Sequence, residues 1–174
     1  MNDIDPLLAA ISFAARAHRN HFRKDRETPY IAHPFRVTFI LRHVFGVTDM
    51  ETLTAAVLHD TIEDTTTDHD DLSERFGPRV ADYVAALSKD KRLPEERRER
   101  EYHDGLAAAP AAVQLCKLAD VYDNLLDMRS LSAASRLKAI GKAHEAIERF
   151  ENSLTGDWQN VLDVVRAAIR AAEA

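Results

Sequence analysis

The sequence predicts an all-α protein, a bundle of about eight to ten helices, and three observations support this. Alanine, the best helix former, is frequent, whereas only 5 glycines and 6 prolines occur among the 174 residues. Apolar residues recur at helical spacing, and polar or Gly/Pro segments separate these stretches. No stretch of useful length alternates between apolar and polar residues as a half-buried strand does. We expect a single domain over residues 1–174, because this length is too short for two cores.

Apolar periodicity and helix breakers place five helices in the first half of the chain. Gly46 stops the second, Asp49 precedes the third, and Pro78 suits the first turn of the fifth. The second and third are apolar enough that we expect both to be largely buried. These five helices cover about residues 6–20, 35–44, 50–62, 72–76 and 78–87.

The second half is expected to be helical as well. The segment LPEERREREYHDGL is almost wholly charged, which predicts either a solvated helix or a partly ordered crossing segment. Pro110 opens a long apolar helix that runs through Leu126. Two further helices cover about residues 133–154 and 157–172.

The charge balance argues against polymer partners. With 23 basic and 29 acidic residues the net charge is −6, so neither nucleic acid nor an anionic membrane is favoured. The single Cys116, in an apolar stretch, predicts a buried thiol in a reducing, cytoplasmic compartment. The first residues are acidic and no apolar run approaches ~18 residues, so we expect no export signal and no membrane anchor. The sequence leaves a homo-oligomer open.

The run LHDTIED, residues 58–64, places four ionisable side chains in an otherwise apolar helix. Such groups are costly there unless a metal or ligand satisfies them. In a helix, His59 and Glu63 would fall one turn apart on one face, as would Asp60 and Asp64. A solvated helix end explains Glu63 and Asp64 alone about equally well. The whole run predicts two metal ligands and two further carboxylates.

Two more segments would close such a site. TPYIAHP supplies His33 at the entrance of the second helix, and KLADVYDN supplies Asp120 within an apolar helix. Individually, His33 could cap a helix and Asp120 could pair with Lys117. Joined with His59 and Asp60, they form a set of two imidazoles and two carboxylates. This set suits Mn²⁺, with Fe²⁺, Co²⁺ and Zn²⁺ as alternatives, and differs from a thiolate site.

These motifs resemble the HD-type hydrolase domain of the RelA/SpoT alarmone family. The resemblance rests on PYIAHP, LHDTIEDT, the FG before a helix, and KLAD with Asn124 four residues after its Asp. AHRNHFRKDRETPYIAHP and DKRLP are most similar to the stand-alone small alarmone hydrolases, including those of metazoans. The resemblance implies an all-α HD fold and Mn²⁺-dependent removal of pyrophosphate from the ribose 3′ position of ppGpp-like nucleotides.

The resemblance also implies roles for individual residues. Glu63 and Asp64 correspond to a catalytic pair that would orient the attacking water and accept its proton. The implied metal ligands are His33, His59, Asp60 and Asp120.

Substrate contacts are implied for Arg23 and Lys24, which match an Arg-Lys pair that contacts the nucleotide in relatives, and for Asn124. Lys89 and Lys91 are further candidates for phosphate contacts, although an ordinary charged surface loop also explains them. Cations are needed because a polyphosphate cannot approach four carboxylates unless positive charge offsets the repulsion.

The chain departs from its relatives around the expected substrate. His21 stands where relatives usually carry Gln, Val121 where they carry Lys or Arg, and Leu126 where they carry Arg. Ala143 and His144 stand where some relatives have an aromatic pair. These departures leave the choice between (p)ppGpp and (p)ppApp open.

Two other functions also stay open. The chain could hydrolyse another nucleotide, such as a phosphorylated dinucleotide or a nucleotide monophosphate, or it could be a catalytically idle nucleotide-sensing module. The intact ligand motifs argue against an idle module, and the Glu-Asp pair favours an alarmone hydrolase over generic HD phosphatases. The chain has no GxxxxGKS or GxxxxGKT phosphate loop, which disfavours ATP-driven phosphoryl transfer.

Overall fold

The computed structural model describes residues 4–174. Within this range the chain forms ten α-helices, two short 3₁₀ helices and no strand beyond an isolated bridge between Phe22 and Pro29. The prediction of an all-α bundle is therefore confirmed. In chain order the elements are α1 (Asp5–Ala17), α2 (Ala32–His43), α3 (Met50–Leu58), α4 (Thr61–Asp64), α5 (His69–Phe76), α6 (Pro78–Leu87), α7 (Glu95–Ala108), α8 (Ala111–Leu126), η1 (Met128–Ser130), α9 (Ala133–Phe150), η2 (Gly156–Trp158) and α10 (Gln159–Glu173).

Local side-chain chemistry sets several helix boundaries. Asp49 caps α3 by accepting a hydrogen bond from the backbone N–H of Thr52 at 2.9 Å. Asp68 and Asp71 form a capping box at the start of α5. Gly77 joins α5 to α6 at a φ of +90°, a conformation that disfavours any side chain.

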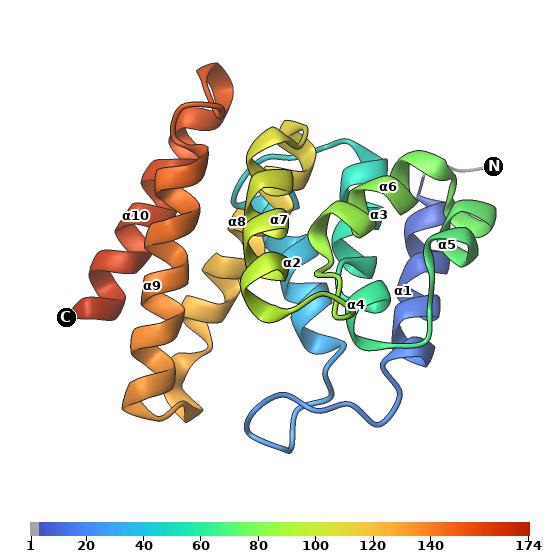
Figure 1. The fold of residues 1–174 in the computed structure, drawn as a ribbon, viewed down its shortest axis with the longest axis horizontal. Coiled ribbons are helices and arrows are strands. Elements are labelled where there is room, and N and C mark those ends of the chain that lie inside the picture. The colour runs from blue at the N-terminus through green and yellow to red at the C-terminus, as the bar shows by residue number, and fades with distance from the viewer. Residues whose placement is uncertain (1–3) are drawn as a thin grey trace.

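The apolar helix α8 lies in the middle of the fold. Its Val113, Leu115 and Leu118 are buried, and it packs against α2, α3, α6, α9 and α10. Figure 1 shows α1, α3, α5 and α6 on one side of it and the antiparallel pair α9 and α10 on the other. Cys116 is buried in this helix, as the sequence predicts. Helices α2 and α3 pack against each other and against α8.

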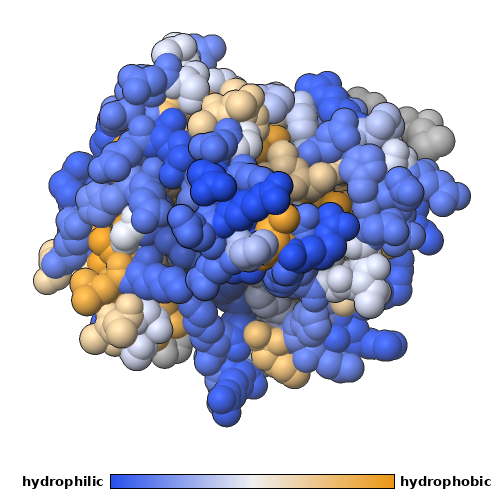
Figure 2. All heavy atoms as spheres, in the orientation of Figure 1, coloured by the Kyte–Doolittle hydropathy of each residue, from blue (hydrophilic) through white to orange (hydrophobic). Residues whose placement is uncertain are grey.

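The charged segment before α8 is an ordered helix. It forms α7, whose only fully buried side chain is Leu106, so the solvated-helix expectation is the correct one. Hydrophilic side chains cover most of the face on which α7 lies (Figure 2). Within residues 4–174, no helix combines the length and apolar character that a membrane span requires.

The first and ninth helices end earlier than expected. Helix α1 ends at Ala17 rather than near Asn20, because Asn20 takes a left-handed φ of +68° that cannot continue a right-handed helix. Helix α9 ends at Phe150 rather than near Leu154, and the chain continues in a turn in which Leu154 N–H still donates to Phe150 O.

The LHDTIED run lies at a break between two helices, which corrects the expectation of one helix over residues 50–62. Helix α3 ends at Leu58 and α4 begins at Thr61. Asp60 adopts φ −100° and ψ 0°, and the Thr61 hydroxyl donates to Leu58 O at 2.7 Å, satisfying a carbonyl at the end of α3. The expected one-turn spacing of His59 and Glu63 on a continuous helix therefore does not hold.

Candidate active site

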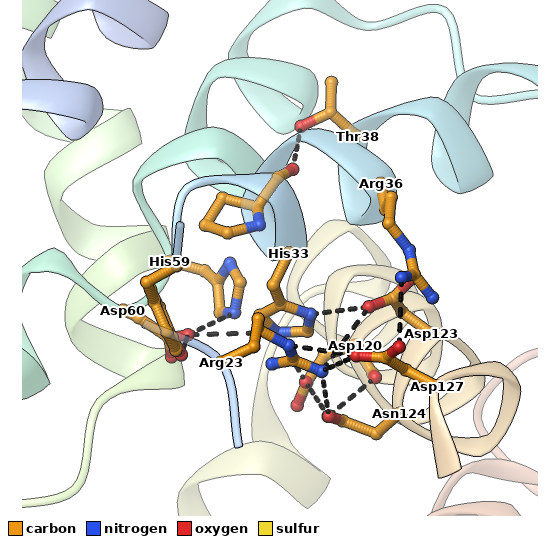
Figure 3. Close-up of polar contacts among 12 residues, drawn as sticks. Arg23, His33, Arg36, Thr38, His59, Asp60, Asp120, Asp123, Asn124 and Asp127 are labelled. Carbon is orange, nitrogen blue, oxygen red and sulfur yellow. Dashed lines mark hydrogen bonds and ion pairs between the residues drawn. The ribbon is translucent and has the colours of Figure 1, made fainter. Parts of the chain in front are cut away.

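Three parts of the fold bring the four predicted metal ligands together, as Figure 3 shows. His33 lies in the first turn of α2, His59 and Asp60 lie at the break after α3, and Asp120 lies in α8. His33 Nε2 is 3.9 Å from Asp60 Oδ2 and 3.2 Å from Asp120 Oδ1. His59 Nε2 is 2.8 Å from Asp60 Oδ2. We call these four residues the ligand cluster.

Hydrogen bonds decide which ring nitrogen of each histidine faces the cluster. His33 Nδ1 lies 2.7 Å from Asp123 Oδ2, and His59 Nδ1 lies 2.8 Å from Ala56 O. Because a carboxylate and a carbonyl only accept, each Nδ1 carries a hydrogen, which leaves Nε2 bare in the neutral ring. A bare Nε2 is the atom that can bind a metal ion.

The donor set fits a divalent cation. His59 Nε2 is buried and makes no hydrogen bond, although Asp60 Oδ2 lies 2.8 Å from it. A buried nitrogen without a partner is costly, and a cation between the ligands would satisfy it. Ligand atoms of His33, His59 and Asp60 all lie within 4.8 Å of one another. Nitrogen and carboxylate donors of this kind suit a divalent transition metal.

Burial and neighbouring charges shift the pKa values in the cluster. Burial lowers the pKa of His59, but the adjacent Asp60 carboxylate outweighs burial and raises it to about 9. Burial alone would raise the pKa of Asp60, but the effect of His59 is larger and holds this pKa well below its usual range. Burial likewise opposes the ionisation of Asp120, but Lys117 holds its pKa well below the usual range. Both carboxylates are therefore ionised at neutral pH and attract positive charge.

Lys117 and Tyr30 hold the two carboxylates in place. Lys117 Nζ donates to Asp120 Oδ2 at 2.8 Å, so the ion pair considered from the sequence exists, but Asp120 Oδ1 still faces His33. The Tyr30 hydroxyl donates to an oxygen of Asp60. Burial and the Asp60 charge raise the pKa of Tyr30, which keeps the hydroxyl protonated. Sequence reasoning missed Tyr30, although it lies in the same TPYIAHP segment as His33.

Glu63 and Asp64 have different surroundings. Glu63 lines a cavity of about 120 Å³ with His59, Asp60 and Asp120 from the ligand cluster, and its Oε2 accepts a hydrogen bond from Lys89 N at 2.9 Å. Asp64 is not among the residues that line this cavity. Its side chain is 37% exposed, and its Oδ1 accepts from Lys91 Nζ at 2.8 Å. The structure thus brings Glu63 to the cluster and leaves Asp64 at the surface beside Lys91.

A basic cavity of about 250 Å³ adjoins the cluster. Four lysines line it, and it shares Asp120 with the smaller cavity. Of these lysines, the sequence predicted only Lys24 as a substrate contact. Lys138 and Lys142 lie one turn apart on α9, which is the signal that could have pointed to them. We call this space the lysine cavity. Its lysines are Lys24, Lys117, Lys138 and Lys142.

Arg23 and Asn124 lie together at the edge of the cluster. Arg23 donates to Asp127 Oδ2 through Nε at 3.1 Å and Nη2 at 2.9 Å, and to Asn124 Oδ1 at 3.1 Å. Asn124 Nδ2 in turn donates to Asp120 Oδ1 at 2.6 Å. Asn124 therefore connects a predicted metal ligand to a predicted nucleotide contact. The sequence analysis did not predict Asp127 as a partner of Arg23, although Asp127 lies one turn beyond Asn124.

The departures from relatives do not all lie at the site. Val121 lines the lysine cavity. Ala143 is buried in the core, and His144 Nε2 lies 2.8 Å from Glu173 Oε1 on α10. Neither lines the lysine cavity, so the positions that we matched to an aromatic pair of relatives do not face the expected substrate.

Known proteins resemble this chain over most of its length. The HD domain family profile matches residues 10–152. The chain is 46% identical over 123 residues to the guanosine-3′,5′-bis(diphosphate) 3′-pyrophosphohydrolase of Homo sapiens, covering 70% of this chain and 69% of that protein. It is 36% identical over 153 residues to the bifunctional (p)ppGpp synthase/hydrolase SpoT of Escherichia coli, covering 84% of this chain and 21% of that protein. A solved structure of a metazoan ortholog of SpoT that hydrolyzes ppGpp has a TM-score of 0.81 at 30% identity, with 94% of both chains covered.

Proposed function

The chain belongs to the HD domain family, and we propose on that basis that it is a metal-dependent hydrolase that removes pyrophosphate from the 3′ position of alarmone nucleotides. The relatives bear out the resemblance to the RelA/SpoT family that the motifs predicted. The observation that carries the proposal is the convergence of two imidazole Nε2 atoms and two carboxylates beside a cavity lined by lysines.

We propose Mn²⁺ as the cation that the ligand cluster holds. A divalent ion such as Mn²⁺ suits this site, because it accepts both imidazole nitrogens and ionised carboxylates as ligands. When bound, such an ion supplies Lewis-acid activation of water and of the reacting phosphate. The Tyr30 hydroxyl donates to Asp60 and Lys117 donates to Asp120. These hydrogen bonds orient the two carboxylates and leave both imidazoles free to bind the ion.

Glu63 is the residue best placed to accept a proton from the attacking water. Its Oε2 is held by Lys89 N, which leaves Oε1 for the water. The bond that breaks joins the ribose 3′ oxygen to phosphorus, so the leaving oxygen gains a proton that Glu63 can return. Asp64, paired with Lys91, would assist from the rim of the cavity.

The lysine cavity would bind the phosphates of the substrate. Three of its lysines, Lys117, Lys138 and Lys142, supply the positive charge that a pyrophosphate group needs beside ionised carboxylates. Asn124 lines this cavity, and Arg23 lines a smaller cavity that shares Lys24 and Asn124 with it, so Arg23 and Asn124 would hold the nucleoside part.

The direct test is incubation of the purified chain and Mn²⁺ with ppGpp and with ppApp, followed by identification of the products. We expect pyrophosphate together with GDP or ADP, and the faster substrate identifies the base preference. Hydrolysis confined to a dinucleotide or a nucleotide monophosphate would contradict alarmone hydrolysis and favour another HD phosphohydrolase. Nucleotide binding without product in the presence of Mn²⁺ would favour a sensing module.

A second test separates chemistry from metal binding. Glu63→Gln removes the base and keeps the shape, so Mn²⁺ should stay bound while turnover falls by about 10²-fold or more. Asp64→Asn is the matched control at the next residue, and its more exposed position predicts a smaller fall. Metal content and turnover are measured on the same samples. Full turnover in both variants would place the base elsewhere.

A further inference from the structure

The most deeply buried carboxylate near the cluster has no role in the function proposed so far. Asp123 has no exposed surface and lies on α8 between His33 and Arg36 (Figure 3). Its Oδ2 lies 2.7 Å from His33 Nδ1, and its Oδ1 accepts from Arg36 Nε at 2.6 Å. Arg23 Nη2 lies 4.0 Å from Oδ2. A fully buried carboxylate is costly, so its partners indicate what it does.

We propose that Asp123 is a positioning residue for metal binding: it holds the His33 ring in the tautomer and orientation that aim Nε2 at the ligand cluster. This inference rests on the proposed metal site. It follows from the geometry, because Nδ1–H can donate only to an acceptor and Asp123 Oδ2 is the acceptor in reach. With Nδ1 occupied in this way, the lone pair of His33 is confined to Nε2.

The position of Asp123 on α8 makes this support rigid. Asp120 and Asp123 are one helical turn apart, so a single helix carries one ligand of the cluster and the residue that orients another. His59 has a weaker arrangement, since its Nδ1 donates to the neutral carbonyl of Ala56. A charged acceptor makes a stronger hydrogen bond and a more basic imidazole, so His33 should depend on its partner more than His59 does.

The two arginines keep the carboxylate in one rotamer. Arg36 donates to Oδ1, which leaves Oδ2 for His33, and Arg23 adds positive charge 4.0 Å from Oδ2. The competing explanation is that Asp123 serves only as a counter-ion for these arginines. Asp127 offers a matched control, because it lies 2.9 Å from Arg23 Nη2 and 3.3 Å from Arg36 Nη1 and makes no contact with His33 in the described structure.

The experiment compares Mn²⁺ binding by the full chain and by the variants Asp123→Ala, Asp123→Asn and Asp127→Asn, using calorimetric titration. We expect Asp123→Ala to weaken Mn²⁺ binding by about 10- to 100-fold, and Asp123→Asn by about tenfold. Asp127→Asn should stay within about twofold of the wild type. The visible absorption of bound Co²⁺, which reports its ligands, should change in the Asp123 variants and not in Asp127→Asn.

Thermal melting of each variant shows whether it is folded before binding is compared. If Asp123→Ala does not fold, Asp123→Asn decides, because it keeps the volume of the side chain. Wild-type affinity and an unchanged Co²⁺ spectrum in the folded Asp123 variants would overturn the inference. An equal loss of affinity in Asp127→Asn would also overturn it, in favour of the counter-ion role. Absence of Mn²⁺ binding by the wild type would instead contradict the proposed metal site itself.

Discussion

Replacing Arg23 with lysine should weaken both catalysis and stability. The Arg23 side chain is only 14% exposed. Its guanidinium donates twice to Asp127, at 3.1 and 2.9 Å, and once to Asn124, at 3.1 Å. A lysine ammonium is a point charge on a flexible stem and cannot reproduce this planar fork. We expect Arg23→Lys to keep one of the three contacts.

The size of the stability loss follows from the two contacts that disappear. A hydrogen bond is worth a net ~1 kcal/mol, and the 35% exposure of Asp127 keeps these near that value rather than higher. The free energy of unfolding should therefore fall by about 1 to 2 kcal/mol. For a chain of 174 residues this lowers Tm by about 3 to 6 °C. If Arg23 also contacts the nucleotide, kcat/KM should fall about tenfold or more, which corresponds to about 1.4 kcal/mol.

Thermal melting and steady-state kinetics with ppGpp measure the two effects separately. Asp127→Asn is the control, because it weakens the same contacts and leaves Arg23 in the chain. It should lower Tm by a similar amount with a smaller change in kcat/KM. Unchanged kinetics of Arg23→Lys on every hydrolysed nucleotide would remove Arg23 from the substrate site. An unchanged Tm would show that its contacts with Asp127 and Asn124 add nothing to stability.

Three further predictions follow from burial and charge. His59→Ala and Asp120→Ala should each lose most of the bound Mn²⁺, because each removes a donor from the cluster. Metal analysis measures this, and full occupancy in both variants would refute the assignment of these ligands. Burial lowers the pKa of His18 from 6.5 to about 4, so the unfolded chain binds a proton that the folded chain lacks. Stability should therefore fall as pH drops from 6.5 to about 4, less steeply in His18→Gln, and pH-dependent denaturation measures this. Burial raises the pKa of the Cys116 thiol to about 12, so a thiol reagent should label it only on unfolding, and rapid labelling of the native chain would contradict this.

Local chemistry explains how much of the protein could be predicted from its sequence. Periodicity, caps and breakers act over one or two helical turns, and Asp49, Gly77 and Pro78 lie where the sequence predicted helix boundaries. The His-Asp run and the flanking motifs are also local patterns, and the structure brings their side chains together without further assumptions. The main departure is the break after Leu58. Periodicity alone predicts a continuous helix there, but the Thr61 hydroxyl donates to Leu58 O and α3 ends.

The contacts that orient the site depend on how distant helices pack. His33 and Asp123 are 90 residues apart, and no pattern within either helix predicts that they meet. Lys138 and Lys142 stay exposed on α9, and only the packing of α9 against α8 makes them line one cavity with Asp120. The sequence by itself thus determined the fold class, the family and which residues were expected as metal ligands. Which carboxylate holds which imidazole, and which lysines face the cluster, was decided by tertiary packing, because these contacts join residues that local chain geometry cannot bring together.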